Sequence, residues 1–492
     1  MSNHSFDLAA SAYAEMIRQG FKPDFPDGTE AQIEEIRTSV NASHEGLPDL
    51  RGLLWSSIDN DSSRDLDQIE VAERMDGGIR VRVGVANVSA SVAKDTPIDQ
   101  HAAFQTKTVY TGVRNFPMLP NELSTNLTSL NENVDRSAMV VEFLVDSLGR
   151  RTQPAIFEAM VHNRAQLAYS RVGPWLEGKT DPDMKVSGSL ELQAQLQMQN
   201  EAAQALRKHR VSEGALEFHR IEADPVVVDG EVRSIATAPK NHATELIEDF
   251  MIAANETMAE TLQAAGRSCI RRIVRTPERW DRIVELVGRY GTQLPAEPDS
   301  GALNAFLQKQ QKLDPIHYPD LSLAIIKLMG PGEYVLSIGT DTKPLGHFGL
   351  AARDYTHSTA PNRRFADLVM QRLVRALLAN QPAPYTDGEL SAIATQCNLQ
   401  EKAGHKVERT MQKRVAAVAL ADSIGKTFQG VVTGASEKGT YVRVFDPPVE
   451  GRVVRGEKGL DVGDKVTVKL LHTNPQMAFI DFAYISGRPS GH

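Results

Sequence analysis

Cysteine is almost absent from this sequence of 492 residues, which contains only Cys269 and Cys397. Two isolated cysteines provide neither a disulfide framework nor the paired spacing of a cysteine-based metal site. Their scarcity is typical of proteins in a reducing compartment, so we expect a cytoplasmic location. Long apolar runs are also absent, and the first residues lack the basic-then-apolar pattern of a signal peptide. We therefore expect no association with a membrane.

Positive charge is not in excess either, because the net charge is −9. This balance does not point to a nucleic-acid-binding protein. It does not exclude one, since a local basic channel can exist in an acidic protein and the carboxylates of a metal site add to the acidic count. The remaining composition, with 41% hydrophobic and 24% charged residues, is that of a globular protein.

Changes in sequence pattern divide the chain into three parts. Residues 1–48 predict two short helices around a linker that contains prolines, either part of a helix-turn-helix or an arm packed on the next domain. Residues 49–424 mix strand-like and helix-like stretches, which predicts one large α+β domain. Residues 425–492 contain five short strand-like stretches, which predicts a small closed β-barrel of the OB type.

Periodicity locates the main elements inside these parts. Strands are predicted at Gly78–Val88, Met139–Val145 and, after a turn at Asp229-Gly230, Glu231–Ala236. Helices are predicted at Leu8–Gln19, Glu30–Val40, Leu190–Lys208, Ala243–Ala265, Trp280–Tyr290, Asn362–Leu378 and Asp387–Leu420. Barrels of the OB type bind single strands on an aromatic and basic face. Candidates for that face are Tyr441, Arg443, Phe445, Lys469 and His472.

A short acidic stretch contains four aspartates within nine positions, namely Asp59, Asp61, Asp65 and Asp67. Carboxylates this close repel one another unless a cation neutralises them, so the stretch predicts a site for a hard metal ion. One interpretation is a calcium loop that starts at Asp59 and ends at Glu70 in its twelfth position. This interpretation fails at Arg64, where the sharp turn of such a loop requires glycine, and the flanking stretches predict strands instead of helices.

The other interpretation is a magnesium site for phosphoryl chemistry. If residues 64–69 are extended, Asp65 and Asp67 lie on one face about 6.6 Å apart along the strand. Asp59 then reaches the same ion from the preceding loop. Metal ions held in this way stabilise both the attacking and the leaving oxygen of a phosphodiester displacement.

This cluster and several later stretches resemble the signature segments of the ribonuclease II/ribonuclease R family, whose catalytic unit is the RNB domain. The cluster resembles the family pattern of Ile-Asp, a short polar loop and Arg-Asp-x-Asp. The later stretches follow in the family's order: Val85-Ala-Asn-Val-Ser, Phe116-Pro-Met-Leu-Pro-Asn-Glu-Leu-Ser, Leu127-Thr-Ser-Leu-Asn, Leu246-Ile-Glu-Asp-Phe-Met-Ile-Ala-Ala-Asn and Tyr355-Thr-His-Ser-Thr-Ala-Pro-Asn-Arg-Arg-Phe-Ala-Asp-Leu. The resemblance covers roughly residues 52–420, and the C-terminal barrel resembles the S1 domain that this family carries.

The resemblance implies processive 3′→5′ hydrolysis of single-stranded RNA to 5′-nucleoside monophosphates with Mg²⁺, or with Mn²⁺ as an alternative. It implies that Asp59, Asp65 and Asp67 are catalytic and hold the metal ions, with Gln68 in the fourth ligand position. It also implies that Arg363 contacts the scissile phosphate, where a guanidinium stabilises the charge of the transition state. The implied substrate contacts are Tyr110, Phe218, Tyr169, Glu248, Glu408, Arg364 and, in the barrel, Tyr441.

The sequence departs from the family pattern in three places. Gln68 stands where the family usually has a fourth aspartate, so we expect weaker affinity for the metal ion or a shift towards Mn²⁺. Asn362 stands where isoleucine is common. The first 48 residues are shorter than the paired cold-shock barrels that usually guide RNA, so we expect a different route of substrate selection.

A basic stripe supports an RNA path independently of the resemblance. Lys402, Lys406, Arg409 and Lys413 follow one another at helical spacing, on one face of the predicted helix before the barrel. We therefore predict a monomeric exoribonuclease that binds single-stranded RNA. The alternative is a non-catalytic RNA-binding protein of the same fold, weakened by Gln68, and a calcium-binding module comes third.

Overall fold

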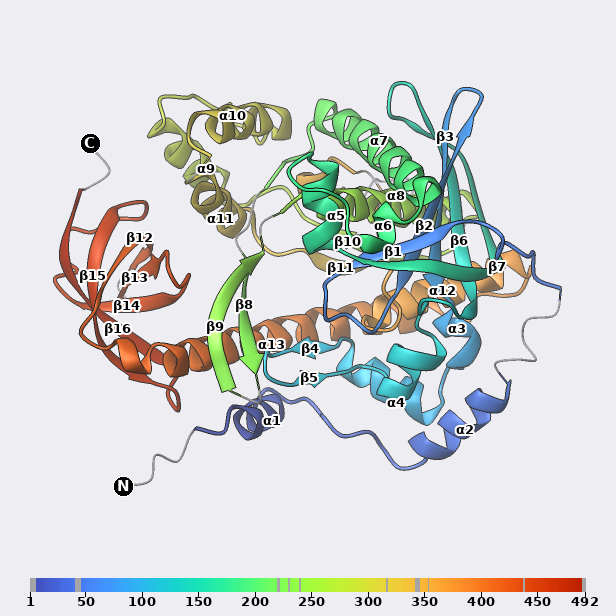
Figure 1. The fold of residues 1–492 in the computed structure, drawn as a ribbon, viewed down its shortest axis with the longest axis horizontal. Coiled ribbons are helices and arrows are strands. Elements are labelled where there is room, and N and C mark those ends of the chain that lie inside the picture. Colours follow the sequence, from blue (N-terminus) through green and yellow to red (C-terminus); the bar gives the residue numbers. More distant parts are fainter. Residues whose placement is uncertain are drawn as a thin grey trace.

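The computed structural model describes residues 6–39, 46–218, 222–228, 231–238, 240–315, 317–340, 346–352, 354–436 and 439–488. A large α+β body and a small β-barrel lie at opposite ends of a long helix, α13 (Asp387–Ala419), in Figure 1. The predicted α+β class is therefore confirmed. The predicted turn at Asp229-Gly230 and the predicted helix end at Val40 lie outside the described residues.

Five strands of the large body form a closed barrel in the order β1-β2-β3-β6-β7. They are β1 (Trp55–Asp59), β2 (Gln68–Met75), β3 (Gly78–Ala86), β6 (Asp135–Asp146) and β7 (Arg151–Ala168). The neighbours pair antiparallel except β1 and β7, which run parallel and close the barrel. Strand β3 alternates half-buried with buried residues before it becomes fully buried, as its sequence pattern predicts.

Helices pack around this barrel and bury its apolar residues in one large core that includes Trp55, Phe143 and Phe250. The helices of this region are α3 (Val88–Ser91), α4 (Pro97–Gln105), η2 (Glu122–Leu127), α5 (Tyr169–Leu176), α6 (Met184–Ser187), α7 (Leu190–Ser212), α8 (His242–Ala264) and α12 (Phe365–Leu378). Helix α7 packs on α8 and on β2, the strand that follows the acidic stretch. The chain enters α8 through a capping box, in which Asn241 and Thr244 satisfy each other's backbone groups.

Smaller elements extend from the large body. Three pairs of strands form two-stranded sheets: β4 (Val109–Tyr110) with β5 (Asn115–Phe116), β8 (Glu222–Val228) with β9 (Glu231–Ala238), and β10 (Cys269–Ile273) with β11 (Glu333–Ser337). A separate small core lies under the helices α9 (Trp280–Gly288), α10 (Ser300–Leu313) and α11 (Tyr318–Met329). A short turn of helix, η3 (Phe348–Leu350), follows them.

The two N-terminal helices pack on different parts of the chain. Helix α1 (Leu8–Arg18) packs on α13, whereas α2 (Thr29–Ser39) packs on α4 and η2 (Figure 1). The apolar face of α1, with Leu8 and Met16, shares a core with Met411 of α13. This arrangement is that of an arm that packs on the next domain, the alternative to a helix-turn-helix.

The C-terminal strands form the predicted second closed barrel, in the order β12-β13-β14-β16-β15. The strands are β12 (Thr427–Ser436), β13 (Gly439–Val444), β14 (Glu450–Arg455), β15 (Lys465–Asn474) and β16 (Phe479–Arg488), and η4 (Ala421–Ser423) precedes them. The core of this barrel includes Ala417 and Leu420 at the end of α13, so the barrel is seated on that helix. In the part of the chain that the structure describes, no helix could cross a membrane.

Candidate active site

Asp67 and Arg363 are separated by 295 intervening residues in sequence but are bonded to each other in the fold. The Oδ2 atom of Asp67 accepts a hydrogen bond of 3.0 Å from Nε of Arg363, and Oδ1 accepts one of 3.0 Å from the backbone N–H of Asn362. Asp67 is only 1% exposed, whereas the Arg363 side chain is 43% exposed. The guanidinium is therefore anchored by a buried carboxylate and still open to a ligand.

Around this pair, the stretch whose extension the magnesium interpretation assumed belongs to a strand only from Gln68 onward, and one helix prediction is wrong at its start. Strand β2 begins at Gln68, so Asp65 and Asp67 lie on a loop and not within a strand. This loop is held by other contacts: the backbone N–H of Ala86 donates to the Asp67 carbonyl at 2.9 Å. Helix α12 begins at Phe365 instead of residue 362, because the backbone N–H of Asn362 turns to Asp67.

The calcium-loop interpretation is also wrong. The acidic stretch runs from the end of β1 at Asp59 to the start of β2 at Gln68. A calcium loop of the EF-hand type requires a helix on each side, and strands of one barrel stand there instead.

Burial governs the electrostatics of the acidic stretch. Burial raises the pKa of Asp67 to about 7, and Arg363 opposes this shift. Burial also raises the pKa of Asp59, which accepts hydrogen bonds from the backbone N–H of Asn60 at 2.7 Å and from the Ser63 hydroxyl at 2.9 Å. The charge of Asp65 raises both of these pKa values further, so the three carboxylates lie within electrostatic reach of one another.

Tyr110 stands over this group of carboxylates. It is the last residue of β4, the residue is 41% exposed, and its hydroxyl donates to Oδ2 of Asp65 at 3.2 Å. Burial of the hydroxyl and the Asp65 charge raise the pKa of Tyr110. A neutral, partly exposed ring beside the carboxylates is suited to stack on a base.

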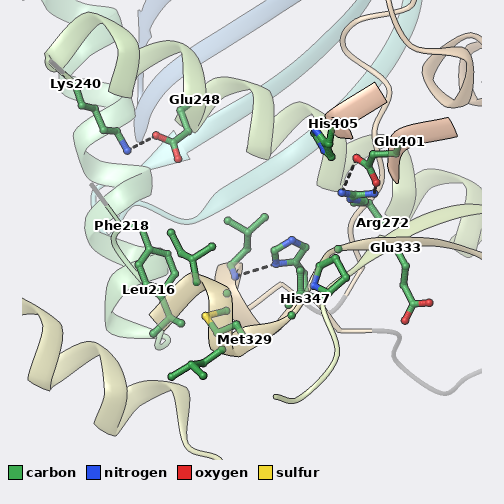
Figure 2. Close-up of a pocket in the computed structure, with 18 of the residues that line it drawn as sticks. Leu216, Phe218, Lys240, Glu248, Arg272, Met329, Glu333, His347, Glu401 and His405 are labelled. Atoms are coloured by element: carbon green, nitrogen blue, oxygen red, sulfur yellow. Dashed lines mark hydrogen bonds and ion pairs between the residues drawn. The ribbon is translucent and has the colours of Figure 1, made fainter. Parts of the chain in front are cut away.

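A cavity of about 1470 Å³ opens beside the acidic stretch, and its lining includes Tyr169, Phe218 and Glu248 (Figure 2). Glu248 forms an ion pair of 2.5 Å with Lys240, which also lines the cavity. Burial opposes ionisation of Glu248, but Lys240, Arg207 and Arg210 together outweigh it and the pKa is lowered. The structure thus brings three of the sequence-predicted substrate contacts into one cavity.

The other predicted substrate contacts do not line this cavity. Glu408 on α13 accepts from Lys107 at 2.9 Å and from His405 at 3.0 Å. Although burial acts in the opposite direction, these two partners lower the pKa of Glu408 to about 2. Arg364 donates to Asp367 at 2.7 Å and so fixes the start of α12.

The predicted barrel face is only partly free. Tyr441 lies with the Lys413 ammonium 5.8 Å from its ring centre. Arg443 forms an ion pair with Asp320 of α11, which joins the barrel to the small helical core. Phe445 is exposed.

The structure also draws attention to two residues that the magnesium interpretation of the sequence did not include. Arg272 forms a two-pronged ion pair with Glu401 on the wall of the cavity, at 2.8 and 3.0 Å (Figure 2). Glu70 on β2 is fully buried close to Asp59, and burial raises its pKa well above the ordinary value. Neither residue belongs to a recognisable motif. For Glu70, the two-residue spacing from Gln68 on a predicted strand was the signal available.

The donor atoms of the acidic stretch suit a magnesium ion that keeps part of its water shell better than they suit an ion enclosed entirely by protein ligands. Among the described residues, no group of three or more His, Cys, Asp or Glu side chains converges as a metal cage. Magnesium does not require one, because it keeps several waters and binds one or two carboxylates together with substrate phosphates. All the donors here are oxygens, which a hard ion prefers.

Comparison with protein families identifies the family of this chain. Residues 48–380 match the model of the RNB domain, and residues 426–485 match that of the RNase II-type exonuclease C-terminal S1 domain. The chain belongs to the RNB family. Asp67 and its partners Asn362 and Arg363 all lie in its RNB domain, and its S1 domain is the second barrel.

Individual relatives agree with this assignment. The chain is 28% identical to ribonuclease R of Escherichia coli over 94% of its own length and 60% of that protein, so it spans about 60% of that relative. The fold matches Mycoplasma genitalium RNase R in complex with ribose methylated single-stranded RNA, with a TM-score of 0.85, 23% identity and coverage of 98% of this chain and 78% of that one. Yeast Ssd1, a pseudonuclease, matches with a TM-score of 0.66, 17% identity and coverage of 88% and 54%.

Proposed function

We propose that this protein is a processive 3′→5′ exoribonuclease that hydrolyses single-stranded RNA to 5′-nucleoside monophosphates. The observation that carries the proposal is the Asp67–Arg363 pair, in which a buried carboxylate beside further carboxylates fixes a half-exposed guanidinium. Carboxylates that hold metal ions next to a cation aimed at a phosphate are the arrangement needed for phosphodiester hydrolysis.

The metal-holding residues in this proposal are Asp59, Asp65 and Asp67, with the amide oxygen of Gln68. Bound Mg²⁺, or Mn²⁺ in its place, would lower the pKa of a bound water and neutralise charge on the leaving oxygen. Arg363 keeps Nε on Asp67 and presents the rest of its guanidinium to the scissile phosphate. The arginine is thereby oriented before RNA arrives, which saves the entropy of positioning it.

The aromatic residues in this proposal hold the 3′ end of the RNA. Tyr110 offers its exposed ring next to Asp65, and Phe218 lies on the wall of the adjoining cavity. Stacking on such rings contributes about 1–3 kcal/mol per base and tolerates any sequence, since every base has a π-face. Tyr169 and Glu248, on the same cavity wall, would contact the sugar and phosphate groups of the neighbouring nucleotides.

A time course on an oligoribonucleotide labelled at its 5′ end tests direction and processivity together. We expect the labelled strand to disappear into one short end product without a ladder of intermediate lengths, while 5′-nucleoside monophosphates accumulate. Labelled fragments cut within the strand, or early release of a labelled mononucleotide from the 5′ end, would contradict the proposal. A parallel substrate with a duplex and a 3′ overhang reports tolerance of structure.

A non-catalytic RNA-binding protein of the same fold is the second candidate, and Gln68 is the observation that favours it. The fold does not decide between the two candidates, because it matches both RNase R and the pseudonuclease Ssd1. If the wild-type protein binds the oligoribonucleotide but releases no nucleotide with Mg²⁺ or Mn²⁺, the second candidate holds.

Replacing Gln68 by aspartate is expected to lower the Mg²⁺ concentration required for half-maximal nucleotide release. The physical reason is that the amide oxygen of Gln68 brings no charge to the ion, whereas a carboxylate adds one. Mg²⁺ activation curves of the wild type and Gln68→Asp measure the effect, and parallel Mn²⁺ curves measure the preference. An unchanged half-saturation would show that position 68 does not influence the ion.

Replacing the exposed basic residues Lys402, Lys406 and Arg409 of α13 by glutamine is expected to flatten the salt dependence of RNA binding. Each phosphate contact that is lost lowers the slope of log affinity against log salt by about 0.7 for a single strand. The measurement is fluorescence anisotropy at several salt concentrations. Lys309→Gln with Lys312→Gln on α10 is the control, and an equal change in that variant would contradict a local role for the stripe.

We further infer that the protein acts in the cytoplasm as a monomer with single-stranded RNA as its partner. The two described cysteines are free and buried, which supports a reducing compartment. Gel filtration with light scattering tests the monomer, and a dimer at micromolar concentration would contradict it.

A further inference from the structure

Arg207 of α7 contacts four carboxylates with one guanidinium group. Its Nε donates to Oδ2 of Asp249 at 3.1 Å, and its Nη1 forms an ion pair of 2.6 Å with Glu245. Two further ion pairs join it to Glu217 at 3.6 Å and to Glu248 at 3.5 Å. The side chain is only 16% exposed. Burial acts to lower the pKa of Arg207, but three of these carboxylates raise it above its usual value, so the guanidinium is charged.

Two of the four carboxylates belong to the wall of the large cavity. Glu248 of α8 lines the cavity itself, and Glu217 directly precedes Phe218, which lines it from another segment (Figure 2). Tyr318 of α11 also fastens that segment, because its hydroxyl donates to the backbone carbonyl of Glu217. Arg207 does not line the cavity, so it acts on a ligand there only through these neighbours.

We propose that Arg207 is a positioning residue, which holds Glu248 and the segment of Phe218 in a fixed relation on the wall that receives the 3′ end of the RNA. This inference rests on the proposed function. Lys240 and Arg207 both contact the Oε2 atom of Glu248. Lys240 is a flexible point charge, which does not by itself fix the direction of a carboxylate.

Arg207 supplies the rigid part of this arrangement. Its Nε is bonded to Asp249, whose side chain is only 1% exposed, so its guanidinium presents Nη1 and Nη2 to Glu217 and Glu248 in one orientation. The two cavity segments are thereby joined through one planar cation. Side chains that are ordered before the RNA arrives lose less entropy when it binds.

The competing explanation is that these ion pairs serve only the packing of α7 on α8. Arg210 separates the two cases. It lies three residues further along α7, forms an ion pair with the same Asp249, and has a side chain that is 17% exposed. Among the described residues, however, Arg210 forms no ion pair with Glu248 or Glu217. It acts on Glu248 only through its charge, which a lysine at position 210 would keep.

The test compares Arg207→Lys with Arg210→Lys in single-turnover nucleotide release from a short single-stranded oligoribonucleotide. Both variants keep a positive charge next to Asp249, but Arg207→Lys loses the planar group that reaches Glu217 and Glu248 together. We expect Arg207→Lys to raise the half-saturating RNA concentration by roughly tenfold and to leave the maximal rate within about threefold, since the loss falls on substrate binding. Arg210→Lys should change both quantities by less than about threefold.

A double variant shows whether Arg207 acts through Glu248. In Arg207→Lys with Glu248→Gln, the half-saturating concentration should rise by less than the product of the two single increases, because residues that act through one contact are not additive. Single effects that multiply in the double variant would overturn the inference. Equal changes in Arg207→Lys and Arg210→Lys would overturn it too, in favour of helix packing.

Thermal unfolding of every variant identifies a loss of folding. If Arg207→Lys does not fold, Glu217→Gln replaces it, because the Glu217 side chain is 26% exposed and belongs to no helix or strand. This change breaks the same link on the side of Phe218, so we expect the half-saturating concentration to rise by about threefold. An unchanged value would overturn the inference. A wild type that binds RNA but releases no nucleotide would overturn the proposed function, and the inference with it.

Discussion

Replacing Asp67 by asparagine is expected to lower nucleotide release from a single-stranded oligoribonucleotide by at least about a thousandfold, the equivalent of roughly 4 kcal/mol of transition-state stabilisation. The amide oxygen can still accept the hydrogen bond from the backbone N–H of Asn362. The amide NH₂, however, would face Nε of Arg363, donor against donor, where the carboxylate now accepts at 3.0 Å. The variant thus loses a negative charge that binds the metal ion. It also loses the hydrogen bond that orients Arg363.

RNA affinity should change little in the same variant, because the aromatic residues and the basic stripe are untouched. Single-turnover release of nucleotides and anisotropy with a labelled strand measure the two quantities separately. Asp76→Asn is the control, since Asp76 lies exposed in the turn between β2 and β3. Retained hydrolysis in Asp67→Asn would place the chemistry elsewhere, and equal loss of hydrolysis and binding would indicate misfolding.

Replacing Arg363 by lysine is expected to lower kcat by roughly 100- to 1,000-fold and to change KM much less. Removing one preorganised donor from a site of developing charge typically has this effect. Lysine keeps the positive charge but is a single flexible point charge, so it cannot hold Asp67 and bind a phosphate in a fixed geometry. The loss should therefore fall on the transition state and not on the bound substrate.

Arg375 offers a closely matched control for that substitution. Its Nε forms an ion pair with Glu158 at 3.1 Å, and its side chain is 39% exposed, close to the 43% of Arg363. Arg375→Lys should leave both kinetic constants within about twofold. If Arg363→Lys raised KM and left kcat unchanged, Arg363 would be a binding residue rather than one that acts in the chemical step.

The local pattern predicted the fold class well because strand and helix periodicities are strong in this chain. Helix α8, for example, lies within one residue of its predicted bounds at both ends. The closure of β1, β2, β3, β6 and β7 into a barrel was not predicted, since closure depends on the parallel pairing of β1 with β7. No local sequence signal carries a pairing between strands so far apart in the chain.

For the candidate site, too, local features of the sequence were predictable and contacts between distant segments were not. The resemblance to the family's motifs identified Asp67 and Arg363, but only the fold reveals that one bonds to the other and that Asn362 lies outside the helix and also bonds to Asp67. Asn362 itself accepts from Thr128 at 2.6 Å, a contact between segments that no spacing rule connects. Glu70 was considered only as the last position of the calcium loop, and its complete burial is visible only in the fold.

The length of helix α13 sets how the two barrels are oriented relative to each other about the helix axis. Its 33 residues extend about 50 Å, and along this length it carries both the core shared with α1 and the seat of the S1 barrel. One residue inserted before Val407 would rotate everything beyond it by about 100° and turn the S1 barrel to another side of the molecule. Seven residues complete two turns to within about 20°. Those seven residues would still move the S1 barrel by about 10 Å along the helix axis, so the length of α13 fixes both the angle and the distance between the large body and the S1 barrel.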